Sequence, residues 1–299
     1  MSDMSERTIL VTGVGGQVGF ELVRSLQGLG RIVALDRRAL DLGNPAQVRA
    51  VLREVRPALI VNPAAYTAVD DAESEPASAT LINEHAPALL AEEAKRLGAV
   101  LIHYSTDYVF DGSKATAYVE EDQAAPLNVY GATKLAGEQA IAQSSVAHMI
   151  FRTSWVYGLR GRNFLRTMRR LATERDRLTI VSDQHGAPTW SRTIADITAH
   201  VVARGMAGSE IDTGWWRERS GIYHLSAGGV TSWYEFALAI FELDPPPMLP
   251  EVVPIAGADY PVRAARPRNS QLSNEKLARV FGLRPPEWKD ALRMCLAGV

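Results

Sequence analysis

The sequence predicts an α/β protein built on a doubly wound parallel sheet, followed by a smaller mixed α/β substrate-binding region. Two observations carry this prediction. Short β-branched, apolar runs alternate with helix-like segments through the first half of the chain, and a glycine-rich turn follows the first run. An apolar run bounded by glycine is typical of a strand that is buried on both faces of a parallel sheet.

The elements of the first half follow in order from this alternation. Apolar, β-branched runs predict strands, and the longer amphipathic segments between them predict helices. The predicted strands cover 8–12, 31–36, 58–62, 100–105 and 149–153, and the predicted helices cover 17–27, 45–53, 78–97 and a segment that starts at Tyr130.

The pattern is less regular after about residue 155. Tryptophans and proline clusters concentrate there, and no internal repeat is visible. We therefore expect 1–155 to form a dinucleotide-binding domain, with later segments returning to its sheet. Residues 156–299 are expected to form mainly a substrate-binding region.

Composition excludes several classes of protein. The chain has 299 residues, 46% hydrophobic and 22% charged, with a net charge of −2. No basic field suggests nucleic acid, and no apolar run is long enough for a signal peptide or a membrane span. Cys295 is the single cysteine, so we expect a buried, inert thiol and no disulfide or cysteine-based zinc site within one chain. A cytoplasmic protein is the expectation.

Glycines recur every third residue after the first predicted strand, at Gly13, Gly16 and Gly19. Glycine permits a tight turn and a close approach of the backbone to a ligand. The helix that starts there offers free N–H groups and a positive dipole to a pyrophosphate. This placement, strand before and helix after, predicts a Rossmann-type dinucleotide site.

The end of the second predicted strand bears on the choice of cofactor. Asp36 suits a carboxylate that accepts hydrogen bonds from the adenosine ribose. Arg37 and Arg38 follow it and suit a 2′-phosphate. The sequence therefore predicts NADPH or NADH without deciding between them.

Tyr130 and Lys134 lie one helical turn apart, separated by Gly131, Ala132 and Thr133. Residues four apart share a helix face and can reach one ligand. A nearby ammonium favours the phenolate, so we expect the Tyr130 pKa to fall toward working pH. The small residues are expected to let a cofactor ring lie against the helix.

Seven stretches together resemble the dTDP-4-dehydrorhamnose reductase family, within the extended short-chain dehydrogenase/reductase superfamily. The more specific ones are "STDYVFDG" and "NVYGATKLAGE", and the resemblance spans almost the whole chain. The stretches are GVGGQVGFELVRSL (13–26), NPAAYTAVDDAESEP (62–76), HYSTDYVFDG (103–112), PLNVYGATKLAGE (126–138), RTSWVYG (152–158), DQHGAPT (183–189) and RPRNSQLS (266–273).

The resemblance implies roles for individual residues. Thr106, Tyr130 and Lys134 would be catalytic, and Thr106, Asp107 and Trp155 would face the sugar nucleotide, although Trp155 suits packing equally well. His103 and His185 are expected to be structural. The implied cofactor contacts are Gly13, Gly16, Gln17, Val18, Asp36, Arg37, Asp41, Leu42, Ala65, Tyr66, Thr67, Tyr104, Tyr130 and Lys134.

The implied activity is hydride transfer from NAD(P)H to the C4 ketone of dTDP-4-dehydro-L-rhamnose, the last step of dTDP-L-rhamnose synthesis. Alternatives are another nucleotide-sugar 4-ketoreductase, a 4-epimerase or a 4,6-dehydratase. Such dehydratases carry Thr-Asp-Glu, whereas this chain has Thr106, Asp107 and Tyr108. A non-catalytic regulatory subunit is the alternative from another class.

Some relatives form a dimer bridged by a divalent ion that three glutamates bind. Glu21 matches the first of these positions, but the other two align with Arg192 and Lys289. Cations would repel the metal ion, although Glu287 and Asp290 lie nearby and leave a shifted ligand set open. We expect no metal requirement, and a monomer or a metal-independent dimer.

Overall fold

The computed structural model describes residues 7–208 and 210–297. At its centre is a six-stranded sheet in which every neighbouring pair of strands is parallel. The α/β fold class predicted from the sequence is therefore confirmed. In spatial order the strands are β12 (Gly221–His224), β5 (His148–Thr153), β4 (Val100–Thr106), β3 (Leu59–Asn62), β1 (Thr8–Val11) and β2 (Arg31–Ala34).

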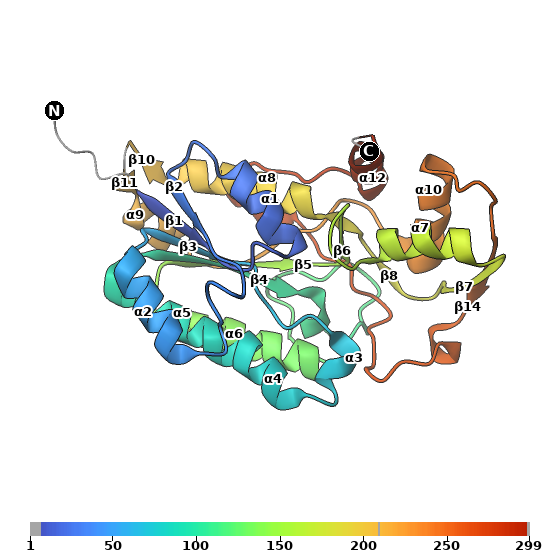
Figure 1. The fold of residues 1–299 in the computed structure, drawn as a ribbon, viewed down its shortest axis with the longest axis horizontal. Helices are drawn as coiled ribbons and strands as arrows, with labels where there is room; N and C mark the ends of the chain where they lie inside the picture. The colour runs from blue at the N-terminus through green and yellow to red at the C-terminus, as the bar shows by residue number, and fades with distance from the viewer. Residues whose placement is uncertain (1–6, 209, 298–299) are drawn as a thin grey trace.

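Helices cover both faces of the sheet (Figure 1). One face carries α1 (Gln17–Ser25) and α8 (Ser191–Arg204), which pack against each other. The other face carries α2 (Pro45–Val55), α5 (Ala86–Leu97) and α6 (Val129–Gln143). Because alternate residues of a strand point to opposite faces, β1, β3, β4 and β5 each contribute to two hydrophobic cores.

The prediction of a helix over 78–97 is wrong in one respect, because this segment is not a single regular helix. It consists of α4 (Pro76–Thr80), a π-helical turn (Leu81–His85) and α5. A π turn inserts an extra residue and is frequent at functional sites. Here it contains the buried Asn83, whose side chain bonds to the segment after β3.

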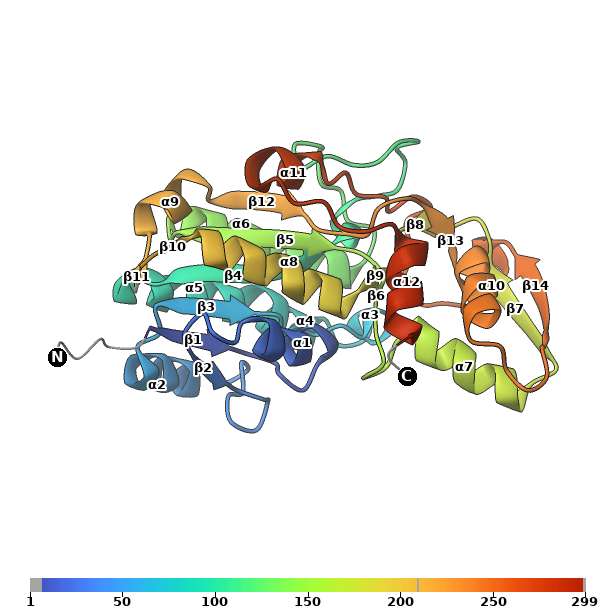
Figure 2. The ribbon, with the colours of Figure 1, turned by 90° about the horizontal axis from the view of Figure 1, so that it is seen from above.

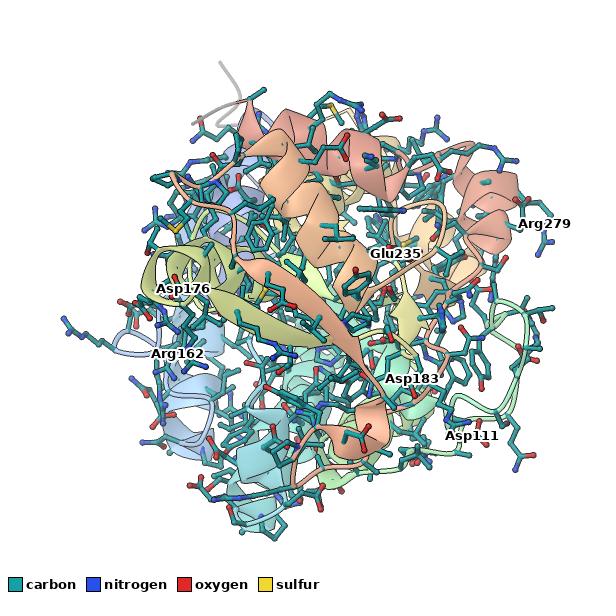
Figure 3. All side chains as sticks on the ribbon, turned by 90° about the vertical axis from the view of Figure 1, so that its right-hand side faces the viewer. Asp111, Arg162, Asp176, Asp183, Glu235 and Arg279 are labelled. Carbon is teal, nitrogen blue, oxygen red and sulfur yellow. The ribbon has the colours of Figure 1, made fainter. Side chains whose placement is uncertain are left out.

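A third core lies in the C-terminal part, beyond the carboxyl ends of the central strands (Figure 2). Its helices are α7 (Phe164–Glu174), α10 (Trp233–Leu243) and α12 (Trp288–Leu296). Figure 3 shows β7 (Arg177–Val181) and β14 (Glu251–Ile255) side by side, with Glu235 labelled at the start of α10. Glu235 and Ser232 form a capping box that fixes this helix start.

The remaining elements are short. Two-residue strands pair β6 (Val156–Tyr157) with β9 (Thr189–Trp190), β8 (His185–Gly186) with β13 (Thr231–Ser232), and β10 (Met206–Ala207) with β11 (Glu210–Ile211). The short helices are α3 (Val69–Ala72), α9 (Thr213–Glu218) and α11 (Glu275–Phe281), with 3₁₀ turns at Asp107–Val109 and Gly257–Asp259.

Segments after residue 155 do return to the sheet, since β12 pairs with β5 and α8 packs on α1. The division into cofactor and substrate regions near this residue stays a prediction. Cys295 is buried, as expected, and burial raises the pKa of its thiol to about 12. Among the described residues, no helix has the length and apolar character needed to cross a membrane.

Candidate active site

The predicted site residues follow the carboxyl ends of parallel strands. The glycine turn comes after β1, Asp36 after β2, Ala65 after β3 and Trp155 after β5, while Thr106 ends β4. Parallel strands end at the same edge of their sheet, so these segments gather along that edge. Figure 2 shows this edge facing the C-terminal part.

The glycine turn has the geometry that a dinucleotide site needs. Gly13 has a φ of 57°, and a Cβ atom there would lie 2.9 Å from Cβ of Ala64. A Cβ atom at Gly19 would overlap the carbonyl oxygen of Gly13. Helix α1 begins after Gly16, and no side chain caps this end. The N-terminal N–H groups of α1 therefore suit a pyrophosphate.

Gln17 and Val18, which were also expected to contact the cofactor, have different surroundings. Gln17 is held by the C-terminal part, because its Oε1 accepts a hydrogen bond from Asn163 Nδ2 at 2.7 Å. Val18 is partly buried and packs against the core beneath α1 and α8. The turn is thus tied to residues more than a hundred positions later in the chain.

After β2, the structure leaves the cofactor preference open. Asp36 is exposed, and its Oδ1 accepts hydrogen bonds from the backbone N–H groups of Arg38 and Ala39, each at 2.9 Å. Arg37 and Arg38 are also exposed. The carboxylate and both guanidinium groups are therefore accessible at the same corner of the molecule.

Asp41 and Leu42 were expected to flank an adenine. Asp41 Oδ1 accepts a hydrogen bond from the Gly43 N–H at 3.0 Å, which fixes the local turn. The Leu42 side chain belongs to the core under α2 and α5. Only the backbone of Leu42 is thus available to a ligand.

The segment Ala65–Thr67 is held by Asn83, which sequence reasoning missed. Asn83 Oδ1 accepts from the Tyr66 N–H at 2.8 Å, and its Nδ2 lies 3.1 Å from the Tyr66 carbonyl oxygen. The same nitrogen donates to Thr133 Oγ1 at 3.2 Å. Tyr66 itself donates its hydroxyl to Glu75 at 3.0 Å. One buried amide therefore aligns this segment with α6.

Thr106 is hydrogen-bonded to a buried carboxyl group and acts on the pKa of the Tyr130 phenol. Its hydroxyl donates to Asp107 Oδ1 at 2.9 Å. The same oxygen accepts from the Tyr108 N–H at 3.1 Å, which caps the 3₁₀ turn. Thr106 and Asp107 are thus a hydrogen-bonded pair near Tyr130.

The predicted direction of the Tyr130 pKa shift is wrong. Burial raises the pKa of Tyr130 to about 12, the Thr106 hydroxyl opposes this rise, and the Asp107 charge adds to it. Loss of solvation disfavours the phenolate, and here it outweighs any charge effect from the helix. Tyr130 is therefore a neutral phenol, and a proton donor, at ordinary pH.

Lys134 is almost completely buried, with 1% of its surface exposed. Its Nζ lies 2.6 Å from the Tyr104 carbonyl oxygen and 3.1 Å from His103 Nε2. Burial lowers the pKa of Lys134 to about 8, while the Glu138 charge opposes that fall. Glu138 is in turn paired with the buried Arg152 at 2.6 Å.

Most small residues of α6 serve protein packing, and the expectation that a cofactor ring lies against this helix stays a prediction. A Cβ atom at Gly131 would overlap the Tyr108 carbonyl oxygen, and one at Gly137 would overlap that of Asn83. Thr133 is buried beside Asn83. Only Ala132 remains exposed. The glycines therefore let α6 approach the 3₁₀ and π turns closely.

Asp107 has an unusual environment for a carboxylate. It is buried, and its Oδ2 has no hydrogen-bond partner among the described residues. Burial raises the pKa of Asp107 to about 7, against the opposing effects of the Ser270 and Thr106 hydroxyls. The uncharged acid is therefore well populated near neutrality.

Trp155 projects from the chain just after β5 with a φ of 47°. Its ring stacks on Trp233 of α10, with centroids 3.6 Å apart and planes 8° from parallel. A Cβ atom at Gly186 would lie 2.7 Å from Trp155 Cε2. Packing therefore fixes this ring, and a role in substrate contact stays a prediction.

Two more predicted residues take structural positions. The Tyr104 hydroxyl lies 2.7 Å from Thr198 Oγ1 in the core under α8, so only its backbone reaches the side of Lys134. His185 is exposed on β8. His103, by contrast, contacts Lys134 directly, which sequence reasoning did not anticipate. The available signal was the alternation in β4, which puts His103 on the face that α6 covers.

The three aligned metal-site positions do not meet as ligands within the chain. Arg192 Nε lies 3.6 Å from Asp196 on the next turn of α8. Lys289 donates to Glu242 at 2.8 Å. Within residues 7–208 and 210–297, no group of three potential metal-binding side chains occurs.

Comparison with known proteins connects this geometry to one family. The family model described as "RmlD substrate binding domain" matches residues 7–299. The dTDP-4-dehydrorhamnose reductase of Burkholderia thailandensis is 48% identical over 96% of this chain and 97% of its own, and that of Escherichia coli K12 is 44% identical over 96% of each.

Solved structures agree. A dTDP-4-dehydrorhamnose reductase from Bacillus anthracis, in complex with NADP, superposes with a TM-score of 0.89 at 35% identity, covering 98% of this chain and all of the other. A UDP-glucose 4-epimerase from Thermus thermophilus, with NAD, shares the fold with a TM-score of 0.77 at 21% identity, covering 97% of this chain and 98% of its own. The chain therefore belongs to the dTDP-4-dehydrorhamnose reductase family.

Proposed function

We propose that this protein reduces the C4 ketone of dTDP-4-dehydro-L-rhamnose to give dTDP-L-rhamnose, the last step of that synthesis, with NADPH or NADH as the reductant. Family membership supports the substrate class. The observation that carries the chemistry is that Tyr130 shares a face of α6 with the buried Lys134, near Thr106 and its hydrogen bond to Asp107.

The protein's part in the reaction is to place the ketone and deliver a proton. The reduced nicotinamide supplies the hydride. Thr106 and Tyr130 hydrogen-bond the ketone oxygen and hold it in place. As the oxygen gains charge, the Tyr130 hydroxyl gives it a proton, because an alkoxide is a far stronger base than a phenolate. Lys134 then stabilises the phenolate and holds the nicotinamide ribose.

The other roles are proposed from position. The glycine turn and α1 would hold the pyrophosphate, with Asp36 or Arg37 at the adenosine ribose and the segment 65–67 along the middle of the cofactor. Asp107 and Trp155 would contact the sugar nucleotide. The supporting observation is that all of these follow strand ends at one sheet edge.

The alternative activities fit less well. Tyr108 stands where a dehydratase of this fold carries glutamate, and its pKa is raised by burial, so it cannot replace a carboxylate. A non-catalytic subunit would not need both Tyr130 and Lys134. A 4-epimerase would retain its cofactor tightly, so cofactor release on dilution distinguishes it from the reductase.

The discriminating experiment is an NAD(P)H-consumption assay with dTDP-4-dehydro-L-rhamnose, run with each cofactor. 4-Ketosugars linked to UDP or to GDP are tested as alternative substrates that carry a different base. We expect oxidation of the cofactor in stoichiometric amounts with the dTDP-sugar. Turnover only with another nucleotide, or none with either cofactor, would contradict the proposal.

Two further properties belong to the proposal. The protein needs no metal, and it is a monomer or forms a dimer without metal. Support comes from Arg192 and Lys289, the cations at two of the three aligned ligand positions. Each of them already faces a carboxylate of its own chain.

A further inference from the structure

Lys134 is held by two consecutive residues of one strand. Its Nζ reaches the carbonyl oxygen of Tyr104 and Nε2 of His103. The His103 ring is fully buried. It points to the α6 face of β4, whereas the Tyr104 ring lies in the opposite core with Thr198. His103 is therefore the side chain of β4 that contacts the amine.

His103 is itself held by Asn62 of β3, which in turn contacts Thr12 just after β1. Its Nδ1 lies 3.1 Å from Asn62 Nδ2, and Asn62 Oδ1 accepts from the Thr12 hydroxyl at 2.6 Å. Asn62 and Thr12 are both buried. The chain Lys134–His103–Asn62–Thr12 thus crosses β4 and β3 and ends next to Gly13 of the glycine turn.

The chemistry of this chain depends on which ring nitrogen carries hydrogen. Burial, with the Lys134 charge adding to it, holds the pKa of His103 well below its usual value, so the ring is neutral with one donor and one acceptor nitrogen. An ammonium offers only N–H groups. When Lys134 is charged, Nε2 must therefore accept, and the hydrogen must be on Nδ1.

Asn62 can serve either tautomer. In the structure the Asn62 side-chain nitrogen faces Nδ1 of His103, so the ring hydrogen is on Nε2. That tautomer suits an uncharged Lys134 amine. A half-turn of the amide brings its oxygen to Nδ1–H and its nitrogen to Thr12. The Thr12 hydroxyl can donate or accept, so the chain stays satisfied in both directions.

We propose that His103 is a positioning residue for the reaction: its Nε2 holds the Lys134 ammonium in place beside Tyr130, and Asn62 and Thr12 accommodate the tautomer that this requires, with hydrogen on Nδ1. This inference rests on the proposed function and adds a residue to that site. Lys134 is flanked by Tyr130 and Glu138 on α6 and by His103 on β4. Arg152 of β5 neutralises Glu138.

The first test is the pH dependence of kcat and kcat/KM in His103→Gln and His103→Phe. Glutamine keeps an acceptor for the ammonium, whereas phenylalanine removes it. We expect kcat of the Phe variant to fall at least about tenfold, with KM for the sugar little changed. Its alkaline limb should move to lower pH, because the ammonium loses an acceptor. The Gln variant should recover most of the rate.

His224→Gln is the matched control. His224 is also fully buried, two strands away on β12, and its Nδ1 lies 3.1 Å from the Tyr118 carbonyl oxygen. We expect its pH profile to match that of the wild type. A folded His103→Phe variant with wild-type kcat and alkaline limb would overturn the proposal, as would a Gln variant impaired as severely as Phe.

The second test needs neither activity nor a folded Phe variant. ¹⁵N spectra of the histidine rings in the wild type, with His103 assigned by its absence in His103→Gln, report the tautomer directly. We expect a neutral ring with hydrogen on Nδ1 at about pH 6, where Lys134 is charged. A charged ring, or hydrogen on Nε2 at that pH, would contradict the inference even if the reductase activity is confirmed.

Discussion

Replacing Asp107 with asparagine removes a buried carboxyl group while nearly preserving its shape. The pKa of Asp107 is raised from its ordinary 3.8 to about 7, with burial as the first cause. Asp107 therefore binds a proton more tightly in the folded chain than in the unfolded one. Its contribution to stability is fully present below about pH 4 and is lost as pH rises through about 7.

The size of the effect follows from this difference. Each unit of pKa separation between folded and unfolded states corresponds to about 1.4 kcal/mol. Between about pH 5 and pH 8 the Asp107 carboxyl should lower the free energy of unfolding by about 2–3 kcal/mol. Asparagine does not ionise, so the variant does not lose this stability. The free energy of unfolding of the variant minus that of the wild type should therefore increase across the same range.

Urea denaturation at several pH values measures the effect. The exposed Asp259 provides a control, since Asp259→Asn changes a carboxyl group in solvent on a 3₁₀ turn. We expect the wild type and Asp259→Asn to follow one curve, and Asp107→Asn to diverge progressively from both between about pH 4 and pH 7. Parallel curves for all three proteins would refute the reasoning that burial controls this carboxyl.

Three further predictions concern the reaction. Tyr130→Phe should lower the turnover rate by about 10²–10⁴ while leaving sugar and cofactor affinity intact, and near-normal turnover in stopped-flow assays would exclude Tyr130 as the proton donor. The wild type should use both NADH and NADPH, with Asp36→Ala shifting kcat/KM toward NADPH and Arg37→Ala toward NADH; strict use of one cofactor would show that one group is misplaced. EDTA should leave activity and mass in solution unchanged, whereas activity lost on chelation and restored by Mg²⁺ would show a metal requirement.

Local patterns predicted most of the central fold. The strands over 8–12, 31–36, 58–62, 100–105 and 149–153 all occur, with ends within two residues of those in the structure. Glycine spacing located the turn before α1 because a tight strand–helix connection has few solutions. The π turn at 81–85 was missed, because 78–97 was predicted as one helix.

The site was predictable only where partners are close in sequence. Tyr130 and Lys134 share a helix face, and Thr106 ends the strand before them. Asn83 and His103 were not predicted as site residues, because their partners lie on elements that only the folded sheet brings together. The direction of the Tyr130 pKa shift was wrong for a similar reason.

That error came from treating an ammonium one turn away as the main influence on the phenol. Burial depends on which residues pack around the ring, such as Tyr108 of the 3₁₀ turn, and sequence spacing does not reveal this. The same limit applies to the side chains of Leu42 and Tyr104, two residues that the resemblance assigned to the cofactor. Packing places both in the cores of the sheet.

The most direct test of the central claim follows the hydrogen atom itself. The protein is incubated with dTDP-4-dehydro-L-rhamnose and NADPH that carries deuterium at both C4 positions, and the sugar product is examined by mass spectrometry and NMR. We predict one deuterium per product molecule, bound at C4 of dTDP-L-rhamnose, with one cofactor oxidised. A product without deuterium, or a deuterium at any other carbon, would contradict direct reduction of the C4 ketone.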